Sequence, residues 1–292
     1  MVAVYDNLRM LRVNQWLKNA CVFIGFVYSK QWDNAALLVD VSFGFAAFCL
    51  MSSAVYIAND LFDIANDRLH PIKSKRPIAN GDISHQHALF AIVLLLICSF
   101  ILAYIISITA VFILFIYLVI NLTYSVYLKT LPVLELLCIT SGFLLRVLMG
   151  TVAVDISPSL WLILCIGSLT LLLALSKRLA EYVLNESLER KTRRVLEHYS
   201  KRFLEVMLYS SAVLTLICYS LYCIYMDHLI SNVRTISLLY TCPFAIIGVY
   251  RYIYLLRSDM SNDDPVALMR NDKISVANLL IWLGLTWLYL WP

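Results

Sequence analysis

Nine apolar runs of about 20 residues follow one another along the chain, and this repetition constrains the fold most. A helical run of this length matches the hydrocarbon thickness of a bilayer. At 61% hydrophobic and only 14% charged residues, the composition is that of an integral membrane protein. The expected spans are residues 17–30, 35–58, 86–106, 109–128, 132–153, 160–176, 204–224, 235–256 and 274–291. The sequence therefore predicts an all-α integral membrane protein with nine transmembrane helices.

Lysines and arginines are distributed unequally between the two sides of these spans. With the N-terminus placed in the cytoplasm, twenty of the 23 fall on the cytoplasmic side. Lys30 and Arg234 fall on the other side, and Arg146 lies inside a span. Because cytoplasmic loops are enriched in basic residues, we expect a multi-pass protein of the inner (plasma) membrane. The net charge of +4 follows from this bias and gives no reason to expect a nucleic-acid partner.

The organisation between the spans is simple. No Gly- or Ser-rich linker divides the chain, so we expect residues 1–292 to form a single polytopic membrane domain. The N-terminal region shows no signal-peptide cleavage site, and the eight cysteines form no CxxC pair, which predicts unreactive buried thiols. The residues 185–203 mix apolar and charged positions in a way that predicts an amphipathic interfacial helix. The cytoplasmic loops expected to carry function are residues 59–85, 124–135, 177–203 and 257–273.

Three aspartates at i, i+3 and i+7 follow the second span: Asp60, Asp63 and Asp67. On a helix, these positions lie within about 60° of one another, on one face. Carboxylates this close repel one another unless a cation lies among them. Oxygen ligands favour Mg²⁺, which usually completes its shell with water and substrate phosphates. The spacing therefore predicts a Mg²⁺ site formed by the three aspartates.

A basic loop follows the aspartates directly and contains Lys73, Lys75 and Arg76. Pro71 is expected to end the acidic helix near residue 69, and Asp82 or Ser84 to cap the next helix. Basic side chains beside a metal site are suited to phosphate oxygens. The segment 59–85 is thus predicted to bind a Mg²⁺-diphosphate at the membrane surface.

Two further polar segments support this interpretation. In the span 132–153, Glu135, Gly142 and Arg146 share a helix face, and an arginine at that depth needs a partner or a water-filled cavity. We expect Arg146 to bind an anionic group in a central cavity, with a structural ion pair as the alternative. Lys177 and Arg178 end another span and are expected to meet phosphates, although such residues also serve as topology signals and lipid anchors.

At this point the sequence resembles the UbiA-type intramembrane prenyltransferase superfamily, and specifically its decaprenyl-phosphate phosphoribosyltransferase branch. The resemblance covers essentially the whole chain. It is carried by Asn59-Asp60-x-x-Asp63-x-x-x-Asp67, Arg12-x-x-Gln15-Trp16-x-Lys18-Asn19, His70-Pro71-x-Lys73-x-x-Arg76-Pro77-Ile78-Ala79, Ser141-Gly142-Phe143-x-x-Arg146, Ser176-Lys177-Arg178-x-x-Glu181 and Arg194-Val195-Leu196-x-x-Tyr199. One departure matters. The second acidic cluster of the aromatic prenyltransferases is missing, because no carboxylate follows Glu135 until Asp155.

The resemblance implies a nine-helix bundle around a central lipid-open cavity. It also implies a Mg²⁺-dependent enzyme that transfers 5-phosphoribose from 5-phosphoribosyl-1-diphosphate to a polyprenyl (decaprenyl-like) phosphate. In this interpretation Asp60 and Asp63 hold the metal, with Asp67 assisting, and Lys73 and Arg76 bind the diphosphate. The other expected substrate-binding residues are Asn59, Lys18, Tyr124, Lys129, Glu135, Arg146, Lys177 and Arg178.

Two alternatives stay open from the sequence. The first is an aromatic prenyltransferase that uses a prenyl diphosphate donor; the missing second acidic cluster weakens it. The second is a membrane transporter, which would also place charged residues in its spans. A transporter is expected to show polar residues at membrane depth on several helices, and only Arg146 is clearly of this kind. The sequence leaves the oligomeric state open, and a homo-oligomer is compatible with it.

Overall fold

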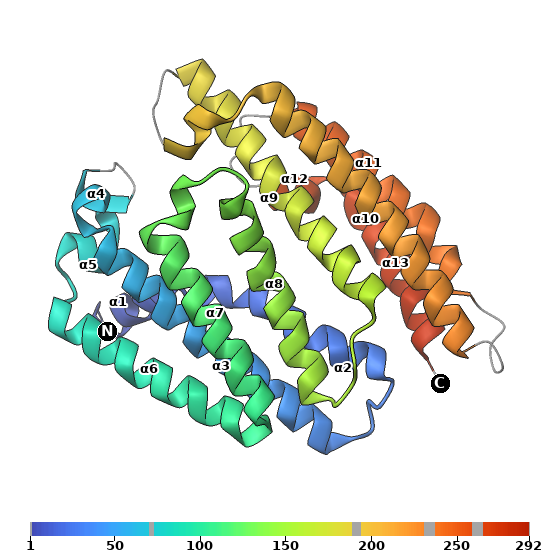
Figure 1. Ribbon diagram of the computed structural model, residues 1–292, viewed down its shortest axis with the longest axis horizontal. Helices are drawn as coiled ribbons and strands as arrows, with labels where there is room; N and C mark the ends of the chain where they lie inside the picture. The colour runs from blue at the N-terminus through green and yellow to red at the C-terminus, as the bar shows by residue number, and fades with distance from the viewer. Residues whose placement is uncertain (1, 70–72, 189–193, 231–236, 259–264, 292) are drawn as a thin grey trace. The chain divides into compact units, whose positions relative to one another are not determined.

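The computed structural model describes residues 2–69, 73–188, 194–230, 237–258 and 265–291, and the regular elements within these ranges are all helices (Figure 1). In this part of the chain, eight helical segments are long and apolar enough to cross a membrane. They are α3 (Ala35–Phe62), α6 (His85–Ile106), α7 (Ile108–Val126), α8 (Leu134–Ala153), α9 (Leu160–Leu188), α10 (Lys201–Ile230), η5 with α11 (Leu238–Thr241 and Cys242–Ser258) and α13 (Lys273–Leu290). The prediction of an all-α membrane protein is confirmed.

The first expected span, residues 17–30, is not among these eight helices and has a different structure. It is divided between a 3₁₀ segment, η1 (Val13–Val22), and a short helix, α2 (Phe23–Ser29). The polar side chains explain the difference, because Asn19 is fully buried and hydrogen-bonds to Ser52 of α3 instead of facing lipid. The count of nine spans is therefore not confirmed: the described residues contain eight.

The first compact unit comprises residues 1–129 and 141–157. Its long helices are α3, α6 and α7, and α3 packs along both of the others. The core contains Val41, Phe48, Met51, Leu114 and Met149, all completely shielded from solvent. Its short elements are α1 (Val2–Leu11), α4 (Ile64–Arg68), η2 (Lys73–Lys75), α5 (Pro77–Asn80) and η3 (Leu128–Thr130), the last of which ends at the boundary of the unit.

The second compact unit comprises residues 130–140 and 158–292. In it, α9 and α10 run side by side over most of their length (Figure 1). Leu136, Leu172, Leu175, Leu179 and Leu204 form the centre of its core. The short elements are η4 (Arg194–His198) and α12 (Pro265–Asn271). The expectation of a single domain over residues 1–292 stays a prediction.

The turns around the acidic segment agree with their sequence signals. The helix α4 ends at Arg68, ahead of Pro71, which lies with His70 and Ile72 outside the described residues. Pro77 occupies the first turn of α5, where its missing N–H costs nothing. Gly81 has φ +94°, a left-handed conformation that favours glycine. Ser84 then caps α6 by accepting a hydrogen bond from the backbone N–H of His87.

The expected interfacial helix over residues 185–203 is not present as one element. In the described ranges, α9 continues to Leu188, η4 spans Arg194–His198, and α10 begins at Lys201. Residues 189–193 lie outside the described part of the chain. The apolar positions Val195, Leu196 and Tyr199 are buried in the core of the second unit rather than facing a membrane surface. Amphipathic spacing alone does not distinguish a helix at a membrane surface from a segment packed in a protein core.

Asp272 links α13 to α11, and we expect its replacement by alanine to lower the thermal midpoint by several degrees. Its carboxylate caps α13 by accepting from the backbone N–H of Ser275 at 2.9 Å, and it accepts two hydrogen bonds from Arg251. The hydrogen bond from Arg251 holds the pKa of Asp272 well below its ordinary value. The stabilisation is therefore fully present above the ordinary aspartate pKa and is lost as the pH falls through the depressed one.

The measurement is thermal unfolding of the purified protein in detergent at neutral and at acidic pH. The difference between wild type and Asp272→Ala should shrink as the pH falls. Asp272→Asn is the matched control, because asparagine still caps a helix but cannot form the ion pair with Arg251. We expect an intermediate midpoint for it. A midpoint for Asp272→Ala equal to that of the wild type at neutral pH would contradict the role of this contact.

Candidate functional site

The three aspartates lie where α3 gives way to α4. The helix α3 ends at Phe62, and Asp63 interrupts the helical pattern with φ −97° and ψ 9°. The interruption is short, since the backbone N–H of Asp67 still donates to the carbonyl of Asp63 at 2.8 Å. Asp60 and Asp67 are buried, 5% and 3% exposed, whereas Asp63 is half-buried. The acidic residues therefore sit at a helix end as predicted, but not on one unbroken helix.

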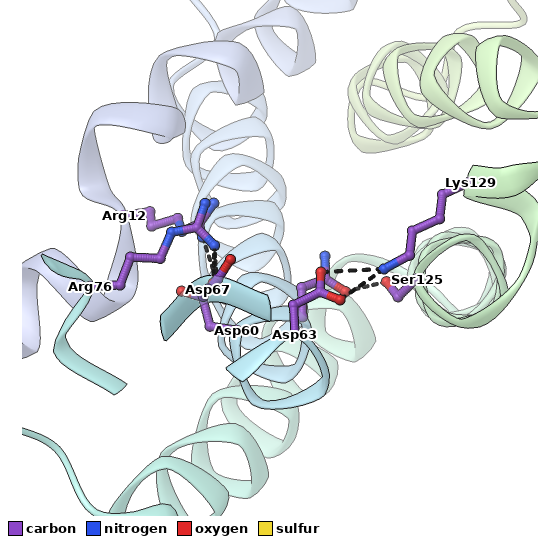
Figure 2. Close-up of polar contacts among 8 residues, drawn as sticks. Arg12, Asp60, Asp63, Asp67, Arg76, Ser125 and Lys129 are labelled. Carbon is purple, nitrogen blue, oxygen red and sulfur yellow. Dashed lines mark hydrogen bonds and ion pairs between the residues drawn. The ribbon is translucent and has the colours of Figure 1, made fainter. Parts of the chain in front are cut away.

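Asp60 and Asp67 share one guanidinium group, that of Arg76 (Figure 2). Arg76 Nη1 lies 2.9 Å from Asp60 Oδ1 and also donates to Asp67 Oδ2. Arg12 donates to the same Oδ1 atom of Asp60 from the N-terminal segment, and its guanidinium lies 5.0 Å from the ring centre of Tyr56. Two buried carboxylates are thus balanced by two arginines, which compensates for much of the cost of burying charge.

Asp63 turns away from this group and pairs with Lys129 (Figure 2). Lys129 Nζ lies 2.9 Å and 3.3 Å from the two carboxylate oxygens of Asp63. Beside this pair, the hydroxyl of Ser125 donates to the side-chain oxygen of Asn59. The two contacts tie the end of α3 to Ser125 at the end of α7 and to Lys129 in the following η3. Of the predicted residues, the structure therefore joins Asn59, Asp63 and Lys129 in one cluster, and Asp60, Asp67 and Arg76 in another.

An open pocket of about 510 Å³ adjoins the arginine cluster. Its lining contains three arginines and two side-chain amides, and the full set is Leu8, Arg9, Arg12, Val13, Asn14, Gln15, Arg76 and Pro77. Arg12 and Arg76 thus contact the buried carboxylates and also line this open space. The three guanidinium groups in this lining are hydrogen-bond donors that suit an anion such as a phosphate group. Lys73, expected to bind the diphosphate, has an exposed side chain on the nearby η2.

Arg12 was not among the expected site residues, although its guanidinium contacts Asp60 in the structure. Its only signal was membership of the Arg12-x-x-Gln15-Trp16 motif, about 50 residues before the aspartates it contacts. No local spacing rule connects residues so far apart in the chain. Ser125 was missed for the same reason. Ser125 lies within the loop 124–135 that was expected to carry function.

The donor atoms suit Mg²⁺, since carboxylate and amide oxygens are the ligands it prefers. However, no group of three His, Cys, Asp or Glu side chains in the described part of the chain is arranged to hold an ion. Figure 2 shows that Arg76 contacts both Asp60 and Asp67, whereas Asp63 pairs separately with Lys129. Arg76 thus occupies one oxygen of each of the two buried carboxylates.

Arg146 was expected to bind an anion in a polar cavity or to pair with an acid. Among the described residues its partners are neutral, and the anion-binding role stays a prediction. Arg146 is 5% exposed and donates to Asn19 Oδ1 at 2.7 Å, the Gly142 carbonyl at 2.6 Å and the Tyr117 hydroxyl at 3.1 Å. The rings of Phe48, Tyr117 and Phe143 surround the guanidinium at 5.1–5.5 Å. Neutral dipoles and aromatic faces thus stabilise this buried cation.

In the second unit, Arg178 is buried between two carboxylates. Its Nε donates to Glu135 at 2.9 Å, and its Nη1 donates to Glu181 at 2.6 Å. Arg178 is 3% exposed at its side chain and Glu135 is completely buried. The arrangement is a buried ion cluster that joins α8 to α9. The expected contacts of Glu135 with ribose and of Arg178 with phosphate stay predictions.

Tyr199 stabilises the start of α8 next to this cluster. Its hydroxyl accepts a hydrogen bond from the backbone N–H of Val133 at 2.7 Å. Val133 has φ +65°, so the bond supports a left-handed turn that valine rarely adopts. Burial raises the pKa of Tyr199. For the remaining predicted residues, Lys18 and Lys177 have exposed side chains and Tyr124 is half-buried, and their substrate contacts stay predictions.

Comparison with known proteins gives a consistent result. Residues 19–290 match the UbiA prenyltransferase family. A decaprenyl-phosphate phosphoribosyltransferase of Mycolicibacterium smegmatis is 29% identical over 95% of this chain and 90% of its own length. The same enzyme of Corynebacterium glutamicum is 30% identical over 94% of this chain and 83% of its own length.

The fold points in the same direction. The structure of a UbiA homologue from Archaeoglobus fulgidus, bound to GPP and Mg²⁺, has a TM-score of 0.70 and 19% sequence identity. The match covers 96% of this chain and 99% of that structure. Since the family match extends over nearly the whole sequence and the helical architecture agrees with it, the chain belongs to the UbiA prenyltransferase family.

Proposed function

We propose that this protein transfers 5-phosphoribose from 5-phosphoribosyl-1-diphosphate to a polyprenyl phosphate, giving polyprenylphosphoryl-5-phosphoribose and diphosphate. The observation that carries the proposal is the cluster of Asp60, Asp67, Arg12 and Arg76 beside an arginine-lined pocket. The two relatives named above supply the substrate class, because both are decaprenyl-phosphate phosphoribosyltransferases that align along most of this chain.

The pocket supports donor binding because a phosphoribosyl diphosphate carries three phosphate groups. Arg9, Arg12 and Arg76 place three cationic side chains around one open space. Phosphates entering it offer Arg12 and Arg76 new hydrogen-bond acceptors. The carboxylates of Asp60 and Asp67 then become available to a metal ion. The same two arginines would thereby balance the carboxylates in the empty site and the donor phosphates in the loaded one.

In the reaction, an oxygen of the lipid phosphate forms a bond to C1 of the ribose, and the bond between C1 and the diphosphate breaks. The acceptor is already anionic at neutral pH, so no strong general base is needed. Catalysis then depends on positioning and on stabilising the charge of the leaving diphosphate. Asp60, Asp63 and Asp67 would hold Mg²⁺, which neutralises the leaving group when it is bound.

We expect transfer of label from ribose-labelled 5-phosphoribosyl-1-diphosphate to the organic phase when purified protein, Mg²⁺ and decaprenyl phosphate are combined. Chelation of divalent ions with EDTA should reduce the rate to background, and added Mg²⁺ should restore it. Omission of the lipid phosphate is the control for carry-over. Absence of label in the organic phase, with protein that remains folded, would overturn the proposal.

The assay also tests the aromatic prenyltransferase alternative. A parallel incubation contains a prenyl diphosphate and an aromatic acid in place of the two proposed substrates. The lack of a carboxylate between Glu135 and Asp155 argues against a second metal site on this helix, so we expect no product. Product in this incubation alone would replace the proposed reaction with prenyl transfer. Membership of a transferase family leaves the transporter alternative without support.

The proposal places the site on the cytoplasmic side of the inner membrane, where a soluble phosphorylated donor is available. The support is the excess of lysine and arginine on that side of the spans. The acidic end of α3 and the basic elements η2 and α5 then face the cytoplasm. Reporter fusions ending after residue 82 and after residue 157 should report opposite sides of the membrane.

A further inference from the structure

The segment η1 holds an uncommon conformation for its length. It continues as a 3₁₀ helix over ten residues, whereas runs beyond three or four residues are unusual. Arg12, immediately before it, has φ +51°, in the left-handed region that disfavours residues with a side chain. Local propensity does not explain such a segment, so its shape must depend on contacts with the rest of the unit.

Polar side chains attach this segment to α3. Trp16 Nε1 donates to Ser53 Oγ at 3.0 Å, and Ser53 Oγ donates to the Leu11 carbonyl at 2.8 Å. Asn19 Nδ2 donates to Ser52 Oγ at 3.2 Å. Asn19 and Ser53 are 0% exposed and Ser52 is 2% exposed, so water does not compete for these bonds. Two adjacent serines of α3 therefore fix both ends of the stretch 11–19.

Arg146 completes the attachment from α8. Its Nε donates to Asn19 Oδ1 at 2.7 Å, so the amide of Asn19 is engaged on both its oxygen and its nitrogen. The other two hydrogen bonds of Arg146, to Gly142 and Tyr117, anchor it within α8 and to α7. Since these partners are neutral and Arg146 is buried, the guanidinium is oriented to hold Asn19 rather than to balance an acid.

The end of the segment is also seated directly on the backbone of α8. A methyl group added at Gly150 would lie 1.8 Å from the carbonyl oxygen of Val22, and one added at Gly25 would lie 2.8 Å from the Gly150 backbone. Side chains cannot be accommodated at either position without a shift. The N-terminal segment is thus held by hydrogen bonds at Asn19 and by close packing at Val22.

We propose that Arg146 is a positioning residue that acts through Asn19. By holding residues 11–22 against α3, it sets the place of Arg12, whose guanidinium contacts Asp60 and lines the arginine-rich pocket. The motif that contains Asn19 and the motif that contains Arg146 are far apart in the sequence, but together they position Arg12. The consequence for donor binding rests on the proposed function. The claim that Arg146 and Asn19 hold residues 11–22 in place does not.

The structural part is tested by hydrogen–deuterium exchange of purified Asn19→Ala and Arg146→Gln. We expect peptides covering residues 11–22 to exchange faster in both variants, with α13 unchanged. Asn278→Ala is the matched control, because Asn278 also donates from a side-chain amide, to the Phe244 carbonyl at 2.9 Å. It should leave exchange of residues 11–22 unaltered. Unchanged exchange of residues 11–22 in either Asn19→Ala or Arg146→Gln would overturn the proposal, whatever happens to activity.

The link to Arg12 is tested by a double-mutant cycle on the Kd of 5-phosphoribosyl-1-diphosphate. Asn19→Ala alone should weaken binding by about tenfold, and by less than about threefold in an Arg12→Ala background, because the residue being positioned is gone. Equal effects in both backgrounds would overturn the link. If the wild type binds no donor, the proposed function fails, and the exchange experiment still decides the positioning role.

Discussion

We expect Asp60→Asn to abolish turnover, with the rate falling by at least about 10²–10³-fold, as for removal of one key electrostatic contact in an active site. Asparagine preserves the size of the side chain and can still accept a hydrogen bond from Arg12 or Arg76. It removes the charge that would hold Mg²⁺ and that both arginines balance. The measurement is transfer of ribose label to lipid at saturating substrates, with a thermal midpoint recorded for the same preparation.

Asp82→Asn is the matched control, because Asp82 is exposed in the same segment and contacts only the neighbouring Asn80 in the described structure. It should retain the wild-type rate. Asp63→Asn is the second test of the metal assignment, and we expect it to be inactive as well. A normal rate in Asp60→Asn or in Asp63→Asn would remove that residue from the proposed metal site.

Arg178→Leu should destabilise the protein by about 3–5 kcal/mol, the range for breaking a buried ion pair from one side. The change leaves Glu135 and Glu181 without their shared cation, and Glu135 is completely buried. Loss of the cation from such a site forces a carboxylate to remain charged in an apolar surrounding or to take up a proton. Thermal unfolding in detergent provides the measurement.

Lys177→Ala is the control for stability, since Lys177 is the exposed neighbour of Arg178 on the same helix. Its thermal midpoint should match the wild type. The double variant Arg178→Leu with Glu135→Leu should recover part of the lost stability, because no charge is then left unpaired at Glu135. If Arg178→Leu unfolds at the wild-type temperature yet fails to bind donor, Arg178 contacts substrate instead of supporting the fold.

Sequence patterns located the long helices well and their ends less well. The span expected at residues 204–224 is part of a helix over Lys201–Ile230, and the one at 160–176 continues to Leu188. Hydropathy marks where a helix is embedded in lipid, whereas backbone hydrogen bonding continues beyond the bilayer. The segment 17–30 was misjudged for the opposite reason. It is apolar enough to suggest a span, but its buried polar side chain Asn19 binds α3.

The positions of the acidic motif and of the basic loop after it were set by the sequence itself, because helix-ending residues and charge spacing act locally. Which charges meet was decided only by the tertiary structure. Asp63 pairs with Lys129 and Asp60 with Arg12, each across tens of residues, and the cation of Arg146 meets the neutral amide of Asn19. From the sequence alone, a carboxylate at a helix end could pair with any of several lysines and arginines. Packing of α3 against the N-terminal segment, α7 and α8 selects among them, since only contacts made in the folded unit offset the cost of burying charge.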